Sequence, residues 1–220
     1  KFFRSVNGGT TWTPLMDNAM SLAIGAIAIS PSSPETIYVG TGEANFSADS
    51  YFGVGVYRID NASSGSPTLT GPLNDDAVNA DIFTGRAISR ILVHPTNTAI
   101  IFVSTASGIG GIGATSGALP SQGIYRSTDA TSADPTFTKL TGLAGNANAS
   151  VRDMVLDPLN PNLLVCSQTG IFVSTDALAA SPVFTQTQPS TGVFTEFAIQ
   201  HTSGPNPTIY AASGFGGGTV

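Results

Sequence analysis

The most informative local pattern lies at residues 1–12, which read Lys-Phe-Phe-Arg-Ser-Val-Asn-Gly-Gly-Thr-Thr-Trp. The short polar side chain of Asn7 can bond backbone groups ahead of it, and Gly8-Gly9 permits a positive φ in a tight turn. We expect Trp12 to fold back as an apolar plug between the two flanking strands. The stretch therefore predicts a β-hairpin whose turn has a structural role and carries out no chemistry.

A pair of strands separated by a short turn recurs along the chain. The copies lie at residues 26–40, 91–104 and 154–167, with a looser copy at 196–212. Equivalent positions of the second strand hold Tyr38, Phe102, Val165 and Tyr210. Runs of β-branched and aromatic residues beside Pro and Asn turns are typical of antiparallel strands. Their near-continuous apolarity predicts that both faces are buried between neighbouring sheets.

A third strand that runs into a turn also recurs. Its copies lie at residues 55–61, 123–129 and 170–176, and a fourth strand follows the last two at 136–140 and 183–187. In these two copies the turn keeps an acidic residue, Asp129 or Asp176, but has lost the Gly-Gly and Trp of the first stretch. We expect Phe137 and Phe184 to take the place of the tryptophan.

Four short strands per unit are typical of a β-propeller blade. The predicted blades span about residues 23–78, 86–144 and 150–190, while residues 194–220 begin a further blade and residues 1–16 end one. Three arrangements fit this pattern: a four-bladed ring closed within one chain, a longer ring, and a ring completed by a neighbouring copy. We favour the longer ring, because the wedge shape of a blade makes four-bladed rings uncommon.

The first stretch also matches a known pattern, Ser-x-Asp-x-Gly-x-Thr-Trp, at Ser5, Asn7, Gly9, Thr11 and Trp12, with Asn7 in place of the Asp. It resembles the Asp-box of bacterial-neuraminidase (BNR) repeat propellers, and the repeats extend this resemblance over essentially the whole chain. The resemblance implies an all-β propeller of four-stranded antiparallel blades, in which this chain forms part of a larger, commonly seven-bladed ring. It also implies that the turns at Asn7, Asp129 and Asp176 are structural and lie opposite the ligand face.

Two phrases narrow the resemblance to a secreted bacterial group that includes xyloglucanases and relatives of sortilin. They are Tyr-Val-Gly-Thr-Gly-Glu at 38–43 and Gly-Val-Gly-Val-Tyr at 53–57. The resemblance selects no activity, because one propeller fold hosts many functions.

Composition restricts the partners and the location. The net charge is −6 and the eight basic residues are scattered singly, so we expect no nucleic-acid partner. No apolar run approaches the length of a membrane span. Charged residues make up only 10%, and Cys166 is the single cysteine, so no disulfide can form within the chain. These features favour an extracellular, periplasmic or cell-surface protein of a bacterium, and a start at Lys1 leads us to expect a processed piece.

Acidic residues gather in two long loops that we expect on the ligand face. They are Glu43, Asp49, Asp75, Asp76 and Asp81. Glycoside hydrolysis uses two carboxylates, so these are the catalytic candidates. The alternative is a solvated rim of turns, because Asp and Asn bond nearby backbone. With Asn74 and Asn79, the last three also offer oxygen ligands for Ca²⁺, although their spacing matches no defined calcium loop; we expect no other metal or cofactor.

Aromatic and basic residues supply the candidates for ligand binding. Tyr51 and Phe52 could stack on a sugar ring or anchor their loop. Arg86, Arg90 and Arg152 begin first strands, which face the central channel, and could clamp a carboxylate as a sialidase does. The alternative is that each arginine bonds neighbouring loop carbonyls. Arg58 and Arg126 share one repeat position, which indicates a structural role.

Three functions remain open. The first is a non-catalytic secreted propeller that binds a glycan or protein surface, favoured by the low charge and the decayed Asp-boxes. The second is a glycoside hydrolase domain, similar to a xyloglucanase or a sialidase, that uses the loop carboxylates. The third is a structural subunit of an extracellular assembly, in which the open blade edges associate between chains.

Overall fold

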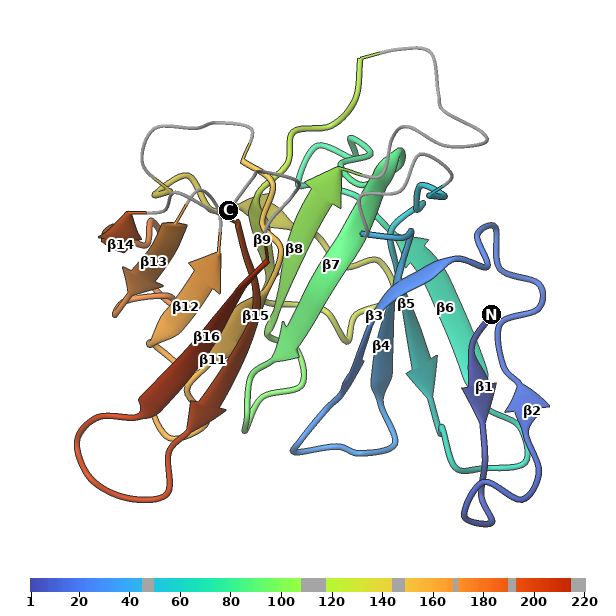
Figure 1. Ribbon diagram of the computed structural model, residues 1–220. Helices are drawn as coiled ribbons and strands as arrows, with labels where there is room; N and C mark the ends of the chain where they lie inside the picture. Colours follow the sequence, from blue (N-terminus) through green and yellow to red (C-terminus); the bar gives the residue numbers. More distant parts are fainter. Residues whose placement is uncertain (45–49, 108–117, 144–148, 168–169, 190–192, 215–220) are drawn as a thin grey trace.

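The computed structural model describes residues 1–44, 50–107, 118–143, 149–167, 170–189 and 193–214. Throughout these residues the regular structure is β-strand, and Figure 1 shows a curved row of antiparallel sheets. Each sheet is formed by strands consecutive in the sequence. The prediction of an all-β fold with four-stranded antiparallel blades is confirmed.

Three sheets are complete blades. The first has the order β3 (Ile24–Ile29), β4 (Ile37–Thr41), β5 (Val56–Asp60) and β6 (Thr68–Leu73). The second has the order β7 (Arg86–Val93), β8 (Ile101–Ser107), β9 (Ile124–Ser127) and β10 (Thr138–Lys139). The third has the order β11 (Met154–Leu156), β12 (Leu164–Ser167), β13 (Gly170–Ser174) and β14 (Thr185–Pro189).

Two strand pairs lie at the ends of the row (Figure 1). One pair is β1 (Phe3–Arg4) with β2 (Thr13–Pro14), and the other is β15 (Val193–Gln200) with β16 (Thr208–Gly214). By the repeat pattern, β1–β2 correspond to the outer half of a blade and β15–β16 to the inner half. The chain is therefore a partial propeller with three complete blades and two half-blades.

The hydrophobic core lies between adjacent sheets, as the two-sided apolarity of the strands predicts. Tyr38 of the first blade packs in one cluster with Ile88 of the second. Phe102 of the second blade packs with Met154 of the third. Smaller clusters hold the terminal strand pairs on the first and third blades. Burial of these apolar faces is the main force that fixes each blade against the next.

Arginine side chains join each sheet to the turn of the next one. In each case one Nη1 atom donates to two backbone carbonyls: Arg4 to Ala62 and Ser64 (both 2.6 Å), Arg58 to Ala130 and Ser132 (both 2.7 Å), and Arg126 to Ala177 and Ala179 (2.7 and 2.8 Å). The N-terminal hairpin therefore occupies the place of an outer half-blade before the first complete blade.

The turns at Asn7, Asp129 and Asp176 form the side-chain hydrogen bonds that their residues predict. The acceptor Oδ1 receives a backbone N–H in each turn: Thr11 donates to Asn7 (2.9 Å), Thr136 to Asp129 (3.0 Å) and Val183 to Asp176 (2.9 Å). Ser5 Oγ also accepts the N–H of Gly9 at 2.8 Å, and Gly8 and Gly9 have positive φ. These turns lie on the lower side of Figure 1, whereas the β4–β5 and β8–β9 loops lie on the upper side.

The expected role of Trp12 as an apolar plug is wrong for this structure. Its side chain is 61% exposed, and its Nε1 donates to the carbonyl of Gly9 at 3.0 Å within the same turn. Phe137 and Phe184, which we expected in its place, are both buried. The difference follows from position: Phe137 and Phe184 belong to complete blades, whereas Trp12 borders a hairpin at the end of the row.

Candidate functional site

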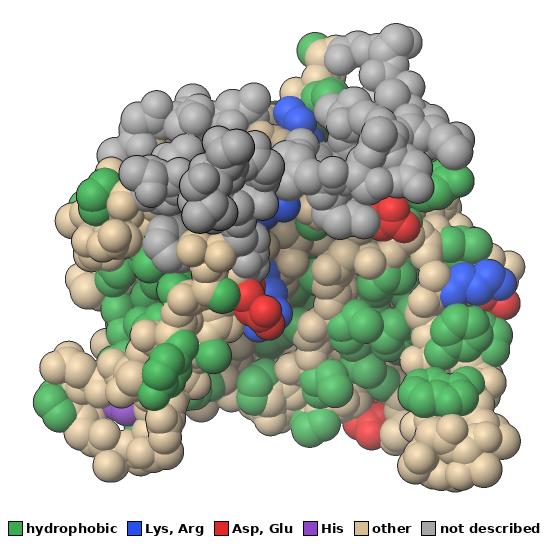
Figure 2. Space-filling view, in the orientation of Figure 1, with side chains coloured by type: hydrophobic (Ala, Val, Ile, Leu, Met, Phe, Trp, Pro, Cys, Tyr) green, Lys and Arg blue, Asp and Glu red, His purple; other side chains and the backbone are tan. Residues whose placement is uncertain are grey.

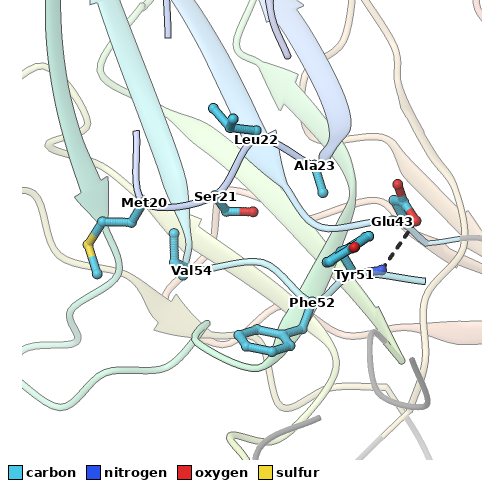
Figure 3. A pocket seen from close by; sticks show the side chains of 8 residues that line it. All are labelled: Met20, Ser21, Leu22, Ala23, Glu43, Tyr51, Phe52 and Val54. Carbon is cyan, nitrogen blue, oxygen red and sulfur yellow. Dashed lines mark hydrogen bonds between the residues drawn. The ribbon is translucent and has the colours of Figure 1, made fainter. Parts of the chain in front are cut away.

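A pocket of about 560 Å³ opens beside the β4–β5 loop. Its lining consists of Met20, Ser21, Leu22, Ala23, Glu43, Tyr51, Phe52 and Val54. Figure 3 shows the segment from Met20 to Ala23 along one side, with Tyr51, Phe52 and Glu43 facing it from the loop. The site thus combines the connection that enters the first blade with the loop between its second and third strands.

Backbone bonds hold both sides of the pocket in place. The N–H of Gly42, which has a φ of 93°, donates to the carbonyl of Ala23 at 2.9 Å. The N–H of Met20 donates to the Tyr57 hydroxyl at 3.1 Å. A side chain at Gly42 would also crowd the backbone of Ala87. Glycine at this position therefore permits the close approach on which the pocket depends.

Glu43 and Tyr51 are joined by two hydrogen bonds. The N–H of Glu43 donates to the carbonyl of Tyr51 at 2.8 Å, and the N–H of Tyr51 donates to Glu43 Oε2 at 3.2 Å. The Tyr51 side chain is 48% exposed and Phe52 is half-buried, so both aromatic rings remain accessible to a ligand. The walls are otherwise mostly apolar. The pocket offers two rings for stacking and one carboxylate for hydrogen bonding.

The other acidic candidates lie outside this pocket. Asp76 Oδ1 accepts the N–H groups of Val78 and Ala80 (2.9 and 3.0 Å), and Asp81 Oδ1 accepts those of Phe83 and Thr84 (3.0 and 2.9 Å). The bonds from Ala80 and then Val78 lower the pKa of Asp76, which opposes a role as general acid. Asp49 lies outside the described residues.

Asp75 connects the loop to the next blade through its backbone. It forms isolated β-bridges with Asp81 and Thr136, and its carbonyl accepts the N–H of Phe137 at 3.0 Å. Asp76 borders a second, smaller pocket of about 320 Å³ whose lining includes Lys139. These acidic residues therefore shape turns and the contact between blades.

The two asparagines considered for Ca²⁺ have local structural roles. Asn74 Nδ2 donates to the carbonyl of Val54 at 3.3 Å, and Asn79 has a left-handed backbone with a φ of 59°. Within the described ranges there is no group of three or more His, Cys, Asp or Glu side chains arranged to hold a metal ion. In the same part of the chain, no helix is long and apolar enough to cross a membrane.

Arg86, Arg90 and Arg152, which we predicted to face a central channel, each have a separate partner. Arg86 Nε donates to the carbonyl of Pro120 at 2.6 Å, and Arg152 Nη1 donates to that of Ala44 at 3.2 Å. Burial lowers the pKa of both guanidinium groups. Arg90 forms an ion pair with Asp153 at 3.2 Å. Two of these arginines thus bond loop carbonyls, the structural alternative to a carboxylate clamp.

Sequence reasoning missed two acidic residues at the inner strands, Asp153 and Glu196. Asp153 is buried; its Oδ1 accepts the N–H of Met154 at 2.8 Å and its Oδ2 accepts that of Phe197 at 2.6 Å. Burial raises the pKa of Asp153, the bonds from Phe197 and Met154 and the charge of Arg90 lower it, and the charge of Glu196 raises it. Figure 2 shows acidic and basic side chains side by side near the centre of this face.

A recurring irregularity of the inner strands could have revealed these positions. The strand pairing shifts register just before Ala26, Arg90 and Glu196, and Asp153 takes the same place in the third repeat. In the first, second and last repeats, one residue of the inner strand thus follows a bulge. Bulges redirect side chains and are frequent near functional sites, but they do not show in the apolar pattern of a sequence.

Comparisons with protein-family models and with curated proteins give no match. Among solved structures, similar folds occur in enzymes of glycoside hydrolase family 74 (GH74). They include an ancestral GH74 enzyme (19% identity, TM-score 0.52), a GH74 enzyme from Niastella koreensis (20%, 0.53) and a GH74 xyloglucanase from Xanthomonas campestris (16%, 0.55).

The matches cover 84%, 86% and 93% of this chain but only 21%, 26% and 28% of those enzymes, in the same order. At this level of identity the similarity shows the fold alone. The chain has the fold of part of a β-propeller, and it spans about a quarter of the length of these structures.

Proposed function

We propose that this chain is a non-catalytic, BNR-type propeller module of a bacterial extracellular protein, and that it binds polysaccharide. The observation that carries the proposal is the pocket between the Met20–Ala23 segment and Tyr51–Phe52. Sugar rings have apolar faces that stack on aromatic side chains and polar edges that form hydrogen bonds. Tyr51 and Phe52 match the first requirement, and the Glu43 carboxylate matches the second.

The size and lining of the pocket support a ligand of a few sugar units. Its volume of about 560 Å³ falls within the usual range for small-molecule sites, which are mostly apolar with a few polar groups. Because one solved structure of similar fold is a xyloglucanase, a β-glucan such as xyloglucan is the first ligand to test.

A non-catalytic role is supported by the arrangement of the carboxylates. Glycosidases need an acid with a raised pKa and a second carboxylate a few ångströms away, roughly 5–10 Å. Among the described lining residues of this pocket, Glu43 is the single acidic side chain. Its Oε2 accepts the N–H of Tyr51. Binding without hydrolysis is therefore the function that this geometry supports best.

The test is calorimetric titration of the chain with xyloglucan oligosaccharides, with cello-oligosaccharides and sialyllactose for comparison. Tyr51→Ala and Phe52→Ala should each weaken binding about tenfold, the effect of losing one stacking contact. Leu159→Ala removes an equally exposed apolar side chain elsewhere and should leave the affinity unchanged. Equal binding by all four proteins, or no binding to any glycan, would overturn the proposal.

A second candidate function is glycoside hydrolysis at the central channel. The observation that favours it is the position of Asp153 near the carboxylate of Glu196, with the pKa of Asp153 raised by burial, since this chemistry needs a carboxyl group of raised pKa near a second carboxylate. Reducing-sugar release from xyloglucan, lost in Glu196→Gln but kept in Asp76→Asn, would establish this function. It would also displace the non-catalytic proposal.

A further inference from the structure

The pocket beside the β4–β5 loop carries a negative charge that is not paired within the described residues. Its described lining includes Glu43 but no lysine, arginine or histidine. The salt bridges of the described residues join other side chains and do not include Glu43. The carboxylate is half-buried among mostly apolar walls, where an electrostatic interaction is stronger than in bulk water. A ligand that enters the pocket therefore meets a carboxylate that can attract a positive charge.

The loop fixes one oxygen of this carboxylate. Glu43 Oε2 accepts the N–H of Tyr51 at 3.2 Å, which holds the carboxylate beside the Tyr51 side chain (Figure 3). Among the described residues, no hydrogen bond reaches Oε1. Arg152 approaches the same loop, but its Nη1 donates to the backbone carbonyl of Ala44 at 3.2 Å and forms no salt bridge with Glu43. One carboxylate oxygen therefore remains for a donor on the ligand.

Tyr51 and Phe52 add a second attraction for positive charge. The face of an aromatic ring attracts a cation, in addition to stacking on the apolar face of a sugar. Both rings line the pocket together with Glu43, and the Tyr51 side chain is 48% exposed. A carboxylate next to accessible aromatic rings suits an ammonium group better than a neutral hydroxyl group, because both attractions act on the charge.

We propose that the pocket selects polysaccharides that carry free amines, and specifically chains of β-linked glucosamine. This inference rests on the proposed function, because a sugar chain must occupy the pocket. One glucosamine ring stacks on Tyr51 or Phe52, and its ammonium group donates a hydrogen bond to Glu43. A glucose ring can donate a hydroxyl group to the same oxygen, but a hydrogen bond between two charged groups is about twice as strong. The carboxylate of an acidic sugar is repelled.

The charge of the whole chain favours the same class of ligand. The net charge is −6, with fourteen acidic and eight basic residues. A field of this sign attracts a cationic polysaccharide and repels an anionic one during their approach. Dissolved salt screens such attraction over about 10 Å at 0.1 M ionic strength. The affinity for glucosamine chains should therefore fall as salt is added, whereas that for neutral chains should change little.

Calorimetric titration with matched oligosaccharides tests the selection. Oligomers of glucose, glucosamine and N-acetylglucosamine share one β-linked backbone and differ in a single substituent, which is a hydroxyl, an ammonium or an uncharged acetamide group. A mildly acidic buffer keeps the amine of glucosamine protonated. The glucosamine oligomer should bind about tenfold more tightly than the glucose oligomer of equal length, the effect of one charge-assisted hydrogen bond. The N-acetylglucosamine oligomer should lack this advantage.

Two variants separate the role of Glu43 from that of net charge. Glu43→Gln keeps the shape of the side chain and an oxygen for the N–H of Tyr51, but removes the charge. The ratio of glucosamine to glucose affinity should then fall to about one. Asp134→Asn removes the same charge from an exposed turn residue and should leave the ratio at about ten. An equal loss of the ratio in both variants would overturn the assignment to Glu43.

The remaining outcomes distinguish this inference from the proposed function. Equal affinities for the glucose and glucosamine oligomers, both weakened by Tyr51→Ala, would overturn the selection of amines and leave polysaccharide binding intact. Failure of every oligosaccharide to bind would overturn both proposals. Trilysine is the probe for recognition of any ammonium group. If trilysine binds as tightly as the glucosamine oligomer and Glu43→Gln abolishes its binding, the pocket recognises a basic peptide and the selection of an amino sugar is wrong.

Discussion

Arg4, Arg58 and Arg126 show how a single residue position joins one sheet to the next. A guanidinium Nη1 that reaches two carbonyls of a neighbouring turn satisfies backbone groups that would otherwise be left without partners. The fourth copy of this position holds Val173, which packs in the apolar cluster against β15 instead. This position therefore holds an arginine where a turn of the next sheet lies beside it. It holds a valine where the strands of the next sheet pack against it.

Replacing Arg126 with Leu should destabilise the chain by about 3 kcal/mol, because the carbonyls of Ala177 and Ala179 lose their charged donor in a buried place. Urea unfolding measures the change. Asp17→Ala removes an exposed ion pair with Lys1 and should change stability by less than about 0.5 kcal/mol. Equal effects of the two substitutions would show that the arginine contacts add nothing to stability.

The ion pair between His201 and Asp157 predicts a pH dependence. Hydrogen bonding to the carbonyl of Gly204 and then to Asp157 raises the pKa of His201 above its ordinary value of 6.5. Burial opposes the ionisation of Asp157, but bonds from Leu159 N–H and from His201 together hold its pKa below 3.8. The histidine contribution to stability is then complete below pH 6.5 and is lost as the pH rises through the raised value. The aspartate contribution is lost as the pH falls through the lowered value.

The urea midpoint of the chain should therefore form a plateau between about pH 4 and 6.5 and fall on the alkaline side. His201→Ala should remove the alkaline fall. His94→Ala is the matched control, because burial lowers the pKa of His94 and its loss should leave that fall in place. A curve for His201→Ala parallel to that of the unchanged chain would contradict the role of this ion pair.

At the scale of strands, glycines set the distance between the first and second blades. A side chain at Gly25 would overlap the carbonyl oxygens of Ile88 and Gly42, and one at Gly40 would overlap the Ile88 side chain. The inner strands β3 and β7 therefore approach more closely than side chains at these glycine positions would allow. This approach positions the loop that carries Glu43 and Tyr51.

Gly25→Ala should destabilise the chain by about 1–3 kcal/mol, the usual cost of forcing an extra group into packed backbone. Thermal unfolding and glycan affinity should both change, since the strand that moves leads away from the Ser21–Ala23 wall of the pocket. Gly65→Ala is the control, because an added methyl group there would meet nothing within 4 Å. Equal melting temperatures for both variants would show that the contact with Ile88 relaxes without cost.

The sequence predicted the strands better than it predicted the contacts between them. Strand periodicity and turn residues are local properties, so the repeats at Tyr38, Phe102 and Val165 were readable without coordinates. Trp12 was misjudged because its burial depends on a neighbouring sheet, which lies far away in the sequence. The partner of His201 was missed for the same reason, since Asp157 precedes it by 44 residues in the ion pair.

One wall of the candidate pocket was predictable from the sequence. Tyr51, Phe52 and Glu43 follow from the length of the loop between the second and third strands, where propellers place ligands. The opposite wall, from Met20 to Ala23, comes from a connection with no motif, and only the close approach at Gly42 brings it near. Glu196 follows a bulge in β15, which the apolar pattern does not show, and Asp153 directly precedes the short strand β11.

At the scale of the whole molecule, the same kind of packing joins each complete blade to its neighbours. Adjacent sheets bury apolar side chains against one another. Within the described residues, Ile27 and Ile29 of β3 remain 55% and 58% exposed, whereas Ile91, the equivalent of Ile27 in the second blade, is 3% exposed. This face of β3 is therefore an accessible apolar surface.

Substituting both Ile27 and Ile29 with Asp should therefore lower the fluorescence of the apolar dye ANS in the presence of the folded chain. Both side chains are more than half exposed, so the melting temperature should change little. Val183→Asp places a charge on one exposed apolar residue of the third blade and should lower the dye fluorescence less, because it removes less apolar surface than the pair of substitutions. Unchanged dye fluorescence in the Ile27 and Ile29 variant would show that this face of β3 does not bind apolar molecules.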